Sequence, residues 1–222
     1  MKITQALLSI LIASIVACTP KQPSAVYSSS SARGASHEKR DHFVDSLMKL
    51  MTLEEKIGQM TLLTSNWAVT GSTVNENYKE EIRKGNVGNI FNAYTVKQNR
   101  ELQEMAVKET RLHIPLLFGL DVIHGHRTIF PVPLAESCSW DLEAMERSAR
   151  IAATEAAAEG INWTFAPMVD IARDPRWGRI TEGGGEDPYL GALIAAARVK
   201  GFQGDDLADT TTILACAKHY AE

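Results

Sequence analysis

The sequence predicts an α/β fold in which helices cover both faces of a parallel sheet. From Asn75 onward, helix-like and strand-like segments alternate along the chain. The strand-like segments are apolar throughout, which is typical of strands buried on both faces. Four of them occur in the 222 residues, whereas a (β/α)8 barrel needs about 250 residues and about eight strand–helix units. The pattern therefore fits either a small doubly wound sheet or about half of a barrel.

Helix-start and helix-stop signals place the helices. Thr52 and Glu55 have the spacing of a capping box, so a helix is expected from there to about residue 60. Gly85 and Gly160 are expected to end two later helices, and Pro188 suits the first turn of another. Further helices are expected at 76–85, 96–113, 141–160 and 188–202.

Continuous apolar runs of strand length separate these helices. They are "NVGNIFN", "IPLLFGLD", "INWTFAPMVDI" and "TTTILACAKHY", at 86–92, 114–121, 161–171 and 210–220. Parallel strands in such folds present ligand-binding loops at their carboxyl ends. The residues that follow these runs are therefore the first candidates for a functional site.

The N-terminus has the features of an export signal. Lys2 precedes an apolar stretch at 6–17 that is too short to span a bilayer. Small residues stand directly before Cys18, as in bacterial lipoprotein signals, where this cysteine is lipidated. The sequence predicts a signal peptide at 1–17, a Ser- and Pro-rich tether at 18–36 and a folded domain at 37–222. We expect an exported lipoprotein of the periplasm or outer membrane.

Composition limits the partners. The net charge of −4 and the hydrophobic fraction of 45% are those of a globular protein. A slightly acidic chain disfavours nucleic acid, because phosphate binding needs a basic face. After the N-terminus no apolar run reaches about 18 residues, so the membrane is expected to be reached only through the lipid anchor. Cys138 and Cys216 do not make a disulfide framework or a zinc set, and Cys216 is expected to be a small core residue.

Charged residues follow three of the predicted strands. Asp121 closes the second strand, and Arg127 follows six residues later. Arg179 lies in "DPRWGR" after the third strand, and Lys218 and His219 end the fourth. An unpaired buried lysine is costly, so Lys218 is expected to lie beside a carboxylate, for which Asp121 is the obvious candidate. This set of donors and acceptors suits a ligand with many hydroxyl groups.

Simpler interpretations stay open for some of these residues. Asp121 could cap a turn, and the two histidines of "HGHRT" alone are a weak signal for a metal site. Arg176 and Asp174 are expected to pair, with Trp177 packed beneath them. The "GGG" stretch lies among acidic residues that would repel phosphate, so we expect a turn leading to a helix capped near Asp187.

Four segments resemble, in this order, the family-3 glycoside hydrolases, chiefly the bacterial periplasmic β-glucosidase branch. They are "MTLEEKIGQM", "LLFGLDVIHGHRTIFPVPLAESCSWD", "FAPMVDIARDPRWGRITEGGGEDPYL" and "AKHY". The resemblance covers about residues 40–222. It implies an α/β fold that is the N-terminal portion of a (β/α)8 TIM-type barrel, incomplete at this length. It also implies retaining, exo-acting hydrolysis of terminal β-linked glucosyl residues, in a β-glucoside or oligosaccharide, without cofactor or metal.

The resemblance assigns sugar-binding roles to Asp121, Arg127, Arg179, Lys218 and His219. The nucleophile and the acid/base of the family match no position here, so no catalytic residue is assigned. The expectation is a truncated fragment of a β-glucosidase that is inactive by itself. The alternatives are a non-catalytic sugar-binding surface lipoprotein, or a scaffold that completes a barrel with another chain.

Overall fold

The computed structural model describes residues 30–65 and 77–220. The predicted signal peptide, Cys18 and the start of the predicted tether lie outside the described residues. The chain divides into two units, Met1–Lys49 and Leu50–Glu222, each considered by itself. In the first, helix α1 (Ser30–Leu50) begins within the stretch interpreted as a tether, where the sequence analysis predicts no helix. Among the described helices, none combines the length and the apolar character needed to cross a bilayer.

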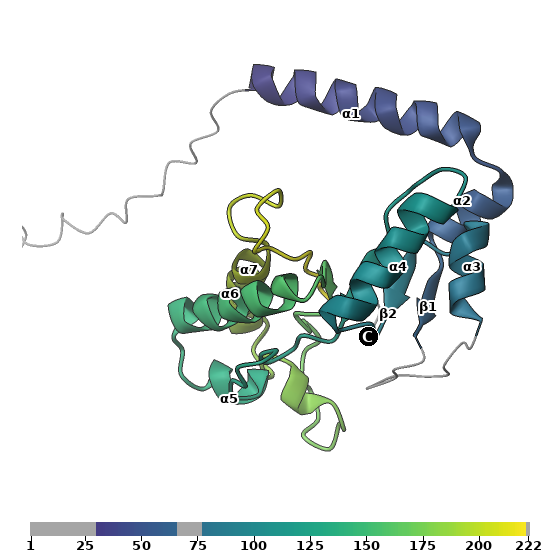
Figure 1. Cartoon of the computed structure of the whole chain (residues 1–222). Helices are drawn as coiled ribbons and strands as arrows, with labels where there is room; N and C mark the ends of the chain where they lie inside the picture. Colours follow the sequence, from purple (N-terminus) through teal and green to yellow (C-terminus); the bar gives the residue numbers. More distant parts are fainter. Residues whose placement is uncertain (1–29, 66–76, 221–222) are drawn as a thin grey trace, which may run out of the picture. The chain divides into compact units, whose positions relative to one another are not determined.

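The second unit is built on a four-stranded parallel sheet (Figure 1). Ile90 pairs with Phe118, and Gly119 pairs with Trp163. The strands neighbour one another in chain order, whereas a doubly wound sheet reverses its order at a switch point. The sequential order is that of a barrel, and it confirms the predicted partial barrel. The strands are β1 (Leu62–Thr64), β2 (Asn89–Phe91), β3 (Leu117–Leu120) and β4 (Trp163–Thr164).

In the second unit, the longer helices lie where their signals predict. Both hydrogen bonds of the capping box are present, since Thr52 Oγ1 accepts from the Glu55 amide and Glu55 Oε2 accepts from the Thr52 amide. Three short elements were not predicted, because segments this short carry no periodic pattern: β1, α5 (Pro133–Ser137) and the 3₁₀ helix η1 (Ile180–Glu182). The confirmed helices are α2 (Leu53–Gln59), α3 (Tyr78–Lys84), α4 (Val96–Glu109), α6 (Leu142–Ala158) and α7 (Pro188–Gln203).

The predicted fourth strand at 210–220 is not a regular strand, which corrects that prediction. The segment still runs parallel to the one after β4, through isolated bridges that join Trp163 to Leu214 and Met168 to Lys218. Between these bridges lies Pro167, which has no N–H to donate, so a continuous ladder cannot form. The predicted strand at 161–171 is shortened to β4 at the same place.

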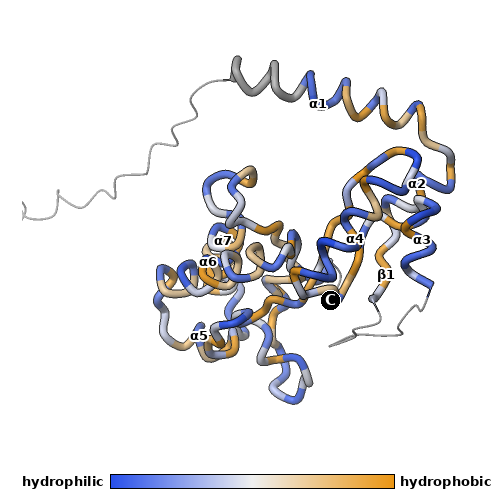
Figure 2. The backbone as a smooth tube through the Cα atoms, in the orientation of Figure 1, coloured by the Kyte–Doolittle hydropathy of each residue, from blue (hydrophilic) through white to orange (hydrophobic). Residues whose placement is uncertain are grey.

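Two clusters of buried side chains form the core. The first packs the sheet against α3 and α4, and the second lies between α6, α7 and the segment after α7. Figure 2 shows the mixed hydropathy of the outer helices α3 and α4 beside the hydrophobic β1. The members include Ile82, Ile90, Leu102 and Phe118 in the first cluster, and Ala152, Ala153, Ala156, Phe202 and Ile213 in the second.

The close approach of α6 and α7 depends on Gly201. A Cβ at Gly201 would lie 2.3 Å from the carbonyl oxygen of Glu146 and 2.7 Å from Cβ of Ala149. Gly191 is in the same helix, but a Cβ at that position would meet no neighbouring atom within 4 Å.

We expect Gly201→Ala to lower the free energy of unfolding by about 1–3 kcal/mol, because it forces the two helices apart. Chemical denaturation of both variants would measure this. Gly191→Ala is the matched control, and it should be neutral or stabilising by about 0.5–1 kcal/mol, because alanine is the better helix former. Equal effects of the two substitutions would contradict the packing argument.

Candidate functional site

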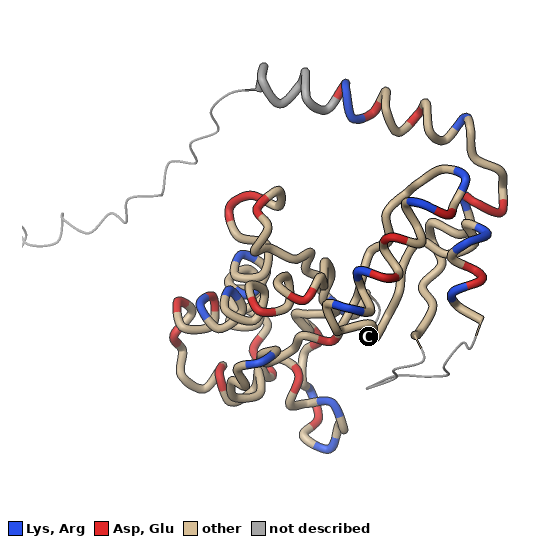
Figure 3. Tube along the Cα trace, in the orientation of Figure 1, with Lys and Arg blue, Asp and Glu red and all other residues tan. Residues whose placement is uncertain are grey.

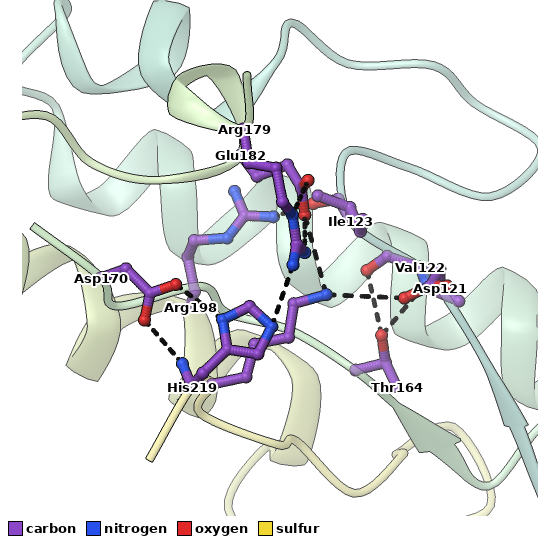
Figure 4. A network of polar contacts seen from close by, with 10 residues as sticks. Asp121, Val122, Ile123, Thr164, Asp170, Arg179, Glu182, Arg198 and His219 are labelled. Atoms are coloured by element: carbon purple, nitrogen blue, oxygen red, sulfur yellow. Dashed lines mark hydrogen bonds and ion pairs between the residues drawn. The ribbon is translucent and has the colours of Figure 1, made fainter. Parts of the chain in front are cut away.

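Charged side chains gather at the carboxyl end of the sheet (Figure 4). Asp121 directly follows β3, Arg179 directly precedes η1, and Lys218 and His219 end the segment that runs beside β4. The peptide bond between Lys218 and His219 is cis. Four of the five predicted site residues lie together at this edge, and Arg127 is the exception.

Lys218 lies between two carboxylates. Its Nζ is 3.6 Å from Asp121 Oδ1 and 3.7 Å from Glu182 Oε2. Only 13% of the Lys218 side chain is exposed, so its charge is largely removed from water and needs such partners. The predicted pairing of Lys218 with Asp121 is therefore present, and Glu182 adds a second partner that the sequence analysis does not assign.

Glu182 also holds Arg179 in a bidentate contact. The Nε and Nη2 atoms of Arg179 donate to the two carboxylate oxygens of Glu182 at 2.7 and 2.8 Å. The η1 turn makes this possible, because it puts the two residues three positions apart on one turn. The hydrogen bonds from Arg179 hold the pKa of Glu182 below its usual value, and the pKa of Arg179 is raised in turn. Both groups are therefore charged at neutral pH.

Asp170 holds His219 from the other side. Its Oδ1 accepts from the His219 backbone N–H at 2.7 Å, and its Oδ2 lies 2.6 Å from ring Nδ1. Burial raises the pKa of Asp170, but the hydrogen bonds from His219 outweigh it, and the net pKa lies below the usual value. The opposite ring nitrogen, Nε2, lies 3.1 Å from Nη1 of Arg179.

The backbone after β3 is fixed by polar anchors from other elements. The buried Thr164 of β4 accepts from the Val122 amide at 3.1 Å and donates to the Val122 carbonyl at 3.2 Å. Arg198 of α7 donates to the Ile123 carbonyl and, at 2.5 Å, to Glu136 of α5. These contacts fix the chain directly after Asp121, and so hold that carboxylate beside Lys218.

Arg127 is bound to α6. Its Nε donates to Glu159 Oε1 at 2.6 Å, and its backbone N–H donates to Glu155. Two neighbours of Arg127 strengthen this attachment: His126 Nε2 lies 2.9 Å from Glu159, and Thr128 donates twice to Glu155. Glu155 of α6 and Glu159 at its C-terminal cap therefore anchor the loop that carries Arg127, and the sugar-binding role of Arg127 stays a prediction.

The turn in "HGHRT" requires its glycine. Gly125 has φ of 114°, and a Cβ there would lie 1.9 Å from the Thr128 carbonyl oxygen. The two histidines of this motif have separate partners: His124 Nδ1 contacts the Phe130 carbonyl at 3.0 Å, and His126 contacts Glu159. Across the described residues, no group of three or more potential ligands could hold a metal ion.

Several other expectations have clear outcomes. Arg176 and Asp174 pair as predicted, at 2.6 Å. Asp187 caps α7 through the Tyr189 amide, also as predicted. Cys216 is only partly buried, which corrects its interpretation as a core residue, because its segment runs along the edge of the sheet beside β4.

The helices of the second unit carry charges of both signs. Figure 3 shows Lys and Arg interspersed with Asp and Glu along α3, α4 and α6. Many of them form exposed ion pairs, such as Lys79 with Glu101 and Arg147 with Glu143. The charges of the candidate site differ from these exposed pairs, because they are partly buried and linked in one connected set. Its members are Asp121, Lys218, Glu182, Arg179, His219 and Asp170.

The connected set offers fixed donors and acceptors to a ligand. Lys218 and Arg179 donate only, and the carboxylates accept only. Because Lys218 and Arg179 already lie beside carboxylates, a neutral ligand with several hydroxyl groups fits this environment better than a strongly charged one. Asp170, Glu182 and Thr164 are the residues that sequence reasoning missed. Asp170 is the last residue but one of the third predicted strand, and Glu182 stands three residues after Arg179, so position alone gave a signal for both.

Comparisons with known proteins show which family this chain resembles. A family model described as "Glycosyl hydrolase family 3 N terminal domain" matches residues 52–222. A periplasmic β-glucosidase of Salmonella typhimurium is 45% identical over 184 residues, which cover 83% of this chain and 24% of that protein.

Solved structures give the same match. A β-glucosidase from Listeria innocua in complex with isofagomine has a TM-score of 0.73 and 40% identity, and the match covers 81% of this chain and 25% of that chain. The same enzyme in complex with glucose has a TM-score of 0.68 and 38% identity, covering 79% and 26%. The chain thus spans about a quarter of the length of the relatives it matches.

The Arg198–Glu136 pair behind the site gives a test of the scaffold. The two side chains are only 4% and 10% exposed. Burial lowers the pKa of Arg198, and Glu136 opposes that shift. Removal of one partner would leave the other charge buried.

We expect Arg198→Met to lower the free energy of unfolding by about 3–5 kcal/mol, because Glu136 is left without its cation. The double variant R198M/E136L should recover part of the loss, since it removes both charges. Arg147→Met on α6 removes an exposed pair and should change stability by less than about 1 kcal/mol. Denaturant titration would measure the free energy of unfolding of all three variants. A small effect of R198M would contradict the assignment of Arg198 and Glu136 as a buried pair in which each charge depends on the other.

Proposed function

This chain belongs to glycosyl hydrolase family 3, and from that premise we propose that it supplies the sugar-holding part of an exo-acting β-glucosidase. The observation that carries the proposal is the position of Lys218 between Asp121 and Glu182, beside Arg179 and His219. All of these residues lie at the carboxyl end of a parallel sheet, where barrel enzymes bind their substrates.

Retaining hydrolysis of β-linked glucosyl residues is proposed for the whole protein. Such a reaction uses two carboxylates, one as nucleophile and one as acid and then base. The carboxylates of the site are engaged: Asp170 with His219, Glu182 with Arg179, and Asp121 with Lys218. We therefore propose that they hold the sugar and its binding residues, and that the reacting carboxylates come from the remainder of the protein.

Asp121, Arg179, Lys218 and His219 are proposed to contact hydroxyl groups of the bound sugar. Hydrogen bonds to charged groups contribute about 1.5–3 kcal/mol each, so this set can orient one ring. A contact of Arg127 with the sugar rests on the family resemblance alone, because its guanidinium is engaged by Glu159. The Listeria relative in complex with glucose supports a β-glucoside as the substrate class.

A second candidate is a sugar-binding lipoprotein without hydrolytic activity. It is favoured by the fact that the proposed sugar contacts all lie within this chain. Both candidates share the same binding residues and predict no turnover by this chain alone, so turnover by a longer chain separates them.

To test the function, the chain from residue 19 would be assayed with an aryl β-glucoside and titrated with glucose. We expect glucose binding without turnover, and at least about a tenfold weaker affinity for Lys218→Met. Lys200→Met is the matched control, because Lys200 pairs with Glu146 on an exposed surface of α7. Efficient turnover would contradict the proposed division of roles. Failure to bind glucose would contradict sugar holding, and binding by a longer chain that is also inactive would favour the second candidate.

Export and anchoring are proposed on the N-terminal sequence. The Salmonella relative is a periplasmic enzyme, which supports export, and the residues before Cys18 support lipidation. The cell compartment would be the periplasm or the outer membrane.

Metabolic labelling with a fatty acid should mark the wild-type protein and leave Cys18→Ser unlabelled. The variant should also move from the membrane to the soluble fraction, because a chain without its acyl groups has no anchor. Cys138→Ser is the control and should remain labelled. Equal labelling of wild type and Cys18→Ser would overturn the lipoprotein assignment.

A further inference from the structure

We propose that Asp170 is a positioning residue that fixes His219 in the tautomer protonated at Nδ1, so that Nε2 is left as a hydrogen-bond acceptor beside Arg179. The inference rests on the proposed function and deepens it, because it specifies how one hydroxyl of the sugar is recognised. The tautomer of His219 can be measured directly in this chain, without an assay of catalytic activity.

The contacts of Asp170 determine one side of the ring. An ionised carboxylate can only accept hydrogen bonds. One oxygen accepts from the His219 backbone N–H, and the other faces ring Nδ1 at 2.6 Å. The side chain of Asp170 is only 6% exposed, so water does not compete for it. A carboxylate in this position requires a proton on Nδ1.

The contact with Arg179 determines the other side of the ring. A guanidinium group can only donate, and Nη1 of Arg179 lies 3.1 Å from Nε2. A proton on Nε2 would place two donors face to face. Arg179 cannot turn away freely, because Glu182 holds its Nε and Nη2 atoms. The two contacts therefore require the same tautomer, in which Nδ1 donates and Nε2 accepts.

This tautomer adds an acceptor next to a donor. Nε2 has a single lone pair, which the Arg179 contact uses in the absence of a ligand. A sugar hydroxyl that inserts between the two groups can accept from the guanidinium and donate to Nε2, in place of their direct contact. A hydroxyl makes both contacts, whereas a hydrogen at the same carbon makes neither. The pair is therefore expected to discriminate against the deoxy sugar that lacks this hydroxyl. Asp170 acts through His219 and does not itself touch the ligand.

The test is nitrogen NMR of the histidine side chains in the full chain at neutral pH. The wild type should show a pyridine-type Nε2 and a pyrrole-type Nδ1 for His219, identified by the loss of its signals in His219→Gln. In Asp170→Asn the side-chain amide cannot accept from both N–H groups. The expected result is a shift of the ring proton to Nε2, together with at least a tenfold loss of glucose affinity.

Asp174→Asn is the matched control, because Asp174 accepts from Arg176 in the neighbouring exposed loop. It should leave both the His219 tautomer and the affinity unchanged. Thermal unfolding would confirm that Asp170→Asn is folded, and Asp170→Ser would replace it if it is not. A wild-type ring protonated at Nε2, or one protonated at both nitrogens, would overturn the proposal, as would an unchanged tautomer in the folded variant. If wild type shows the expected tautomer but binds no sugar, the proposed function fails and the positioning role of Asp170 stands.

Discussion

Lys218 brings a positive charge to a position where only 13% of its side chain meets water, and the surrounding contacts follow from that constraint. A cation in such a place is stable only if anions lie beside it. Asp121 and Glu182 supply them, but Glu182 then needs a fixed position of its own, which Arg179 provides. Arg179 in turn faces His219, whose far side is held by Asp170. Negative and positive groups thus alternate from Asp121 through Lys218 and Glu182 to Arg179, and His219 joins Arg179 to Asp170. Removal of any member leaves a neighbour without its partner.

The helices behind the sheet contribute polar anchors as well as apolar packing. α6 binds the loop after β3 through Glu155 and Glu159, and α7 binds the same loop through Arg198. These anchors join the loop to side chains of the two helices. Contacts outside the site therefore fix the position of the loop after β3. The side chains that face a ligand do not have to hold this loop in place.

The sequence predicted the parts of this architecture that depend on periodicity and on strand ends. The long helices, the parallel sheet and the gathering of Asp121 with Lys218 all follow from local pattern and charge. The destination of Arg127 could not be predicted, because Glu159, which lies 32 positions further along the chain, decides it. The interruption beside β4 depends on one missing N–H at Pro167. The roles of Asp170 and Glu182 depend on which carboxylate lies nearest in space, and several near Arg179 were equally plausible in sequence.

The pairing of Asp121 with Lys218 also has a consequence for biosynthesis. The two residues are 97 positions apart (218 − 121), so the contact has a long sequence separation. Contacts of this kind form late, because the intervening chain must be ordered first. On the ribosome, β3 and its carboxylate emerge well before the lysine, at a rate of about 5–20 residues per second. For several seconds the Asp121 carboxylate of the nascent chain lacks its partner Lys218. The proposed sugar-binding site is complete only when the last described segment docks beside β4.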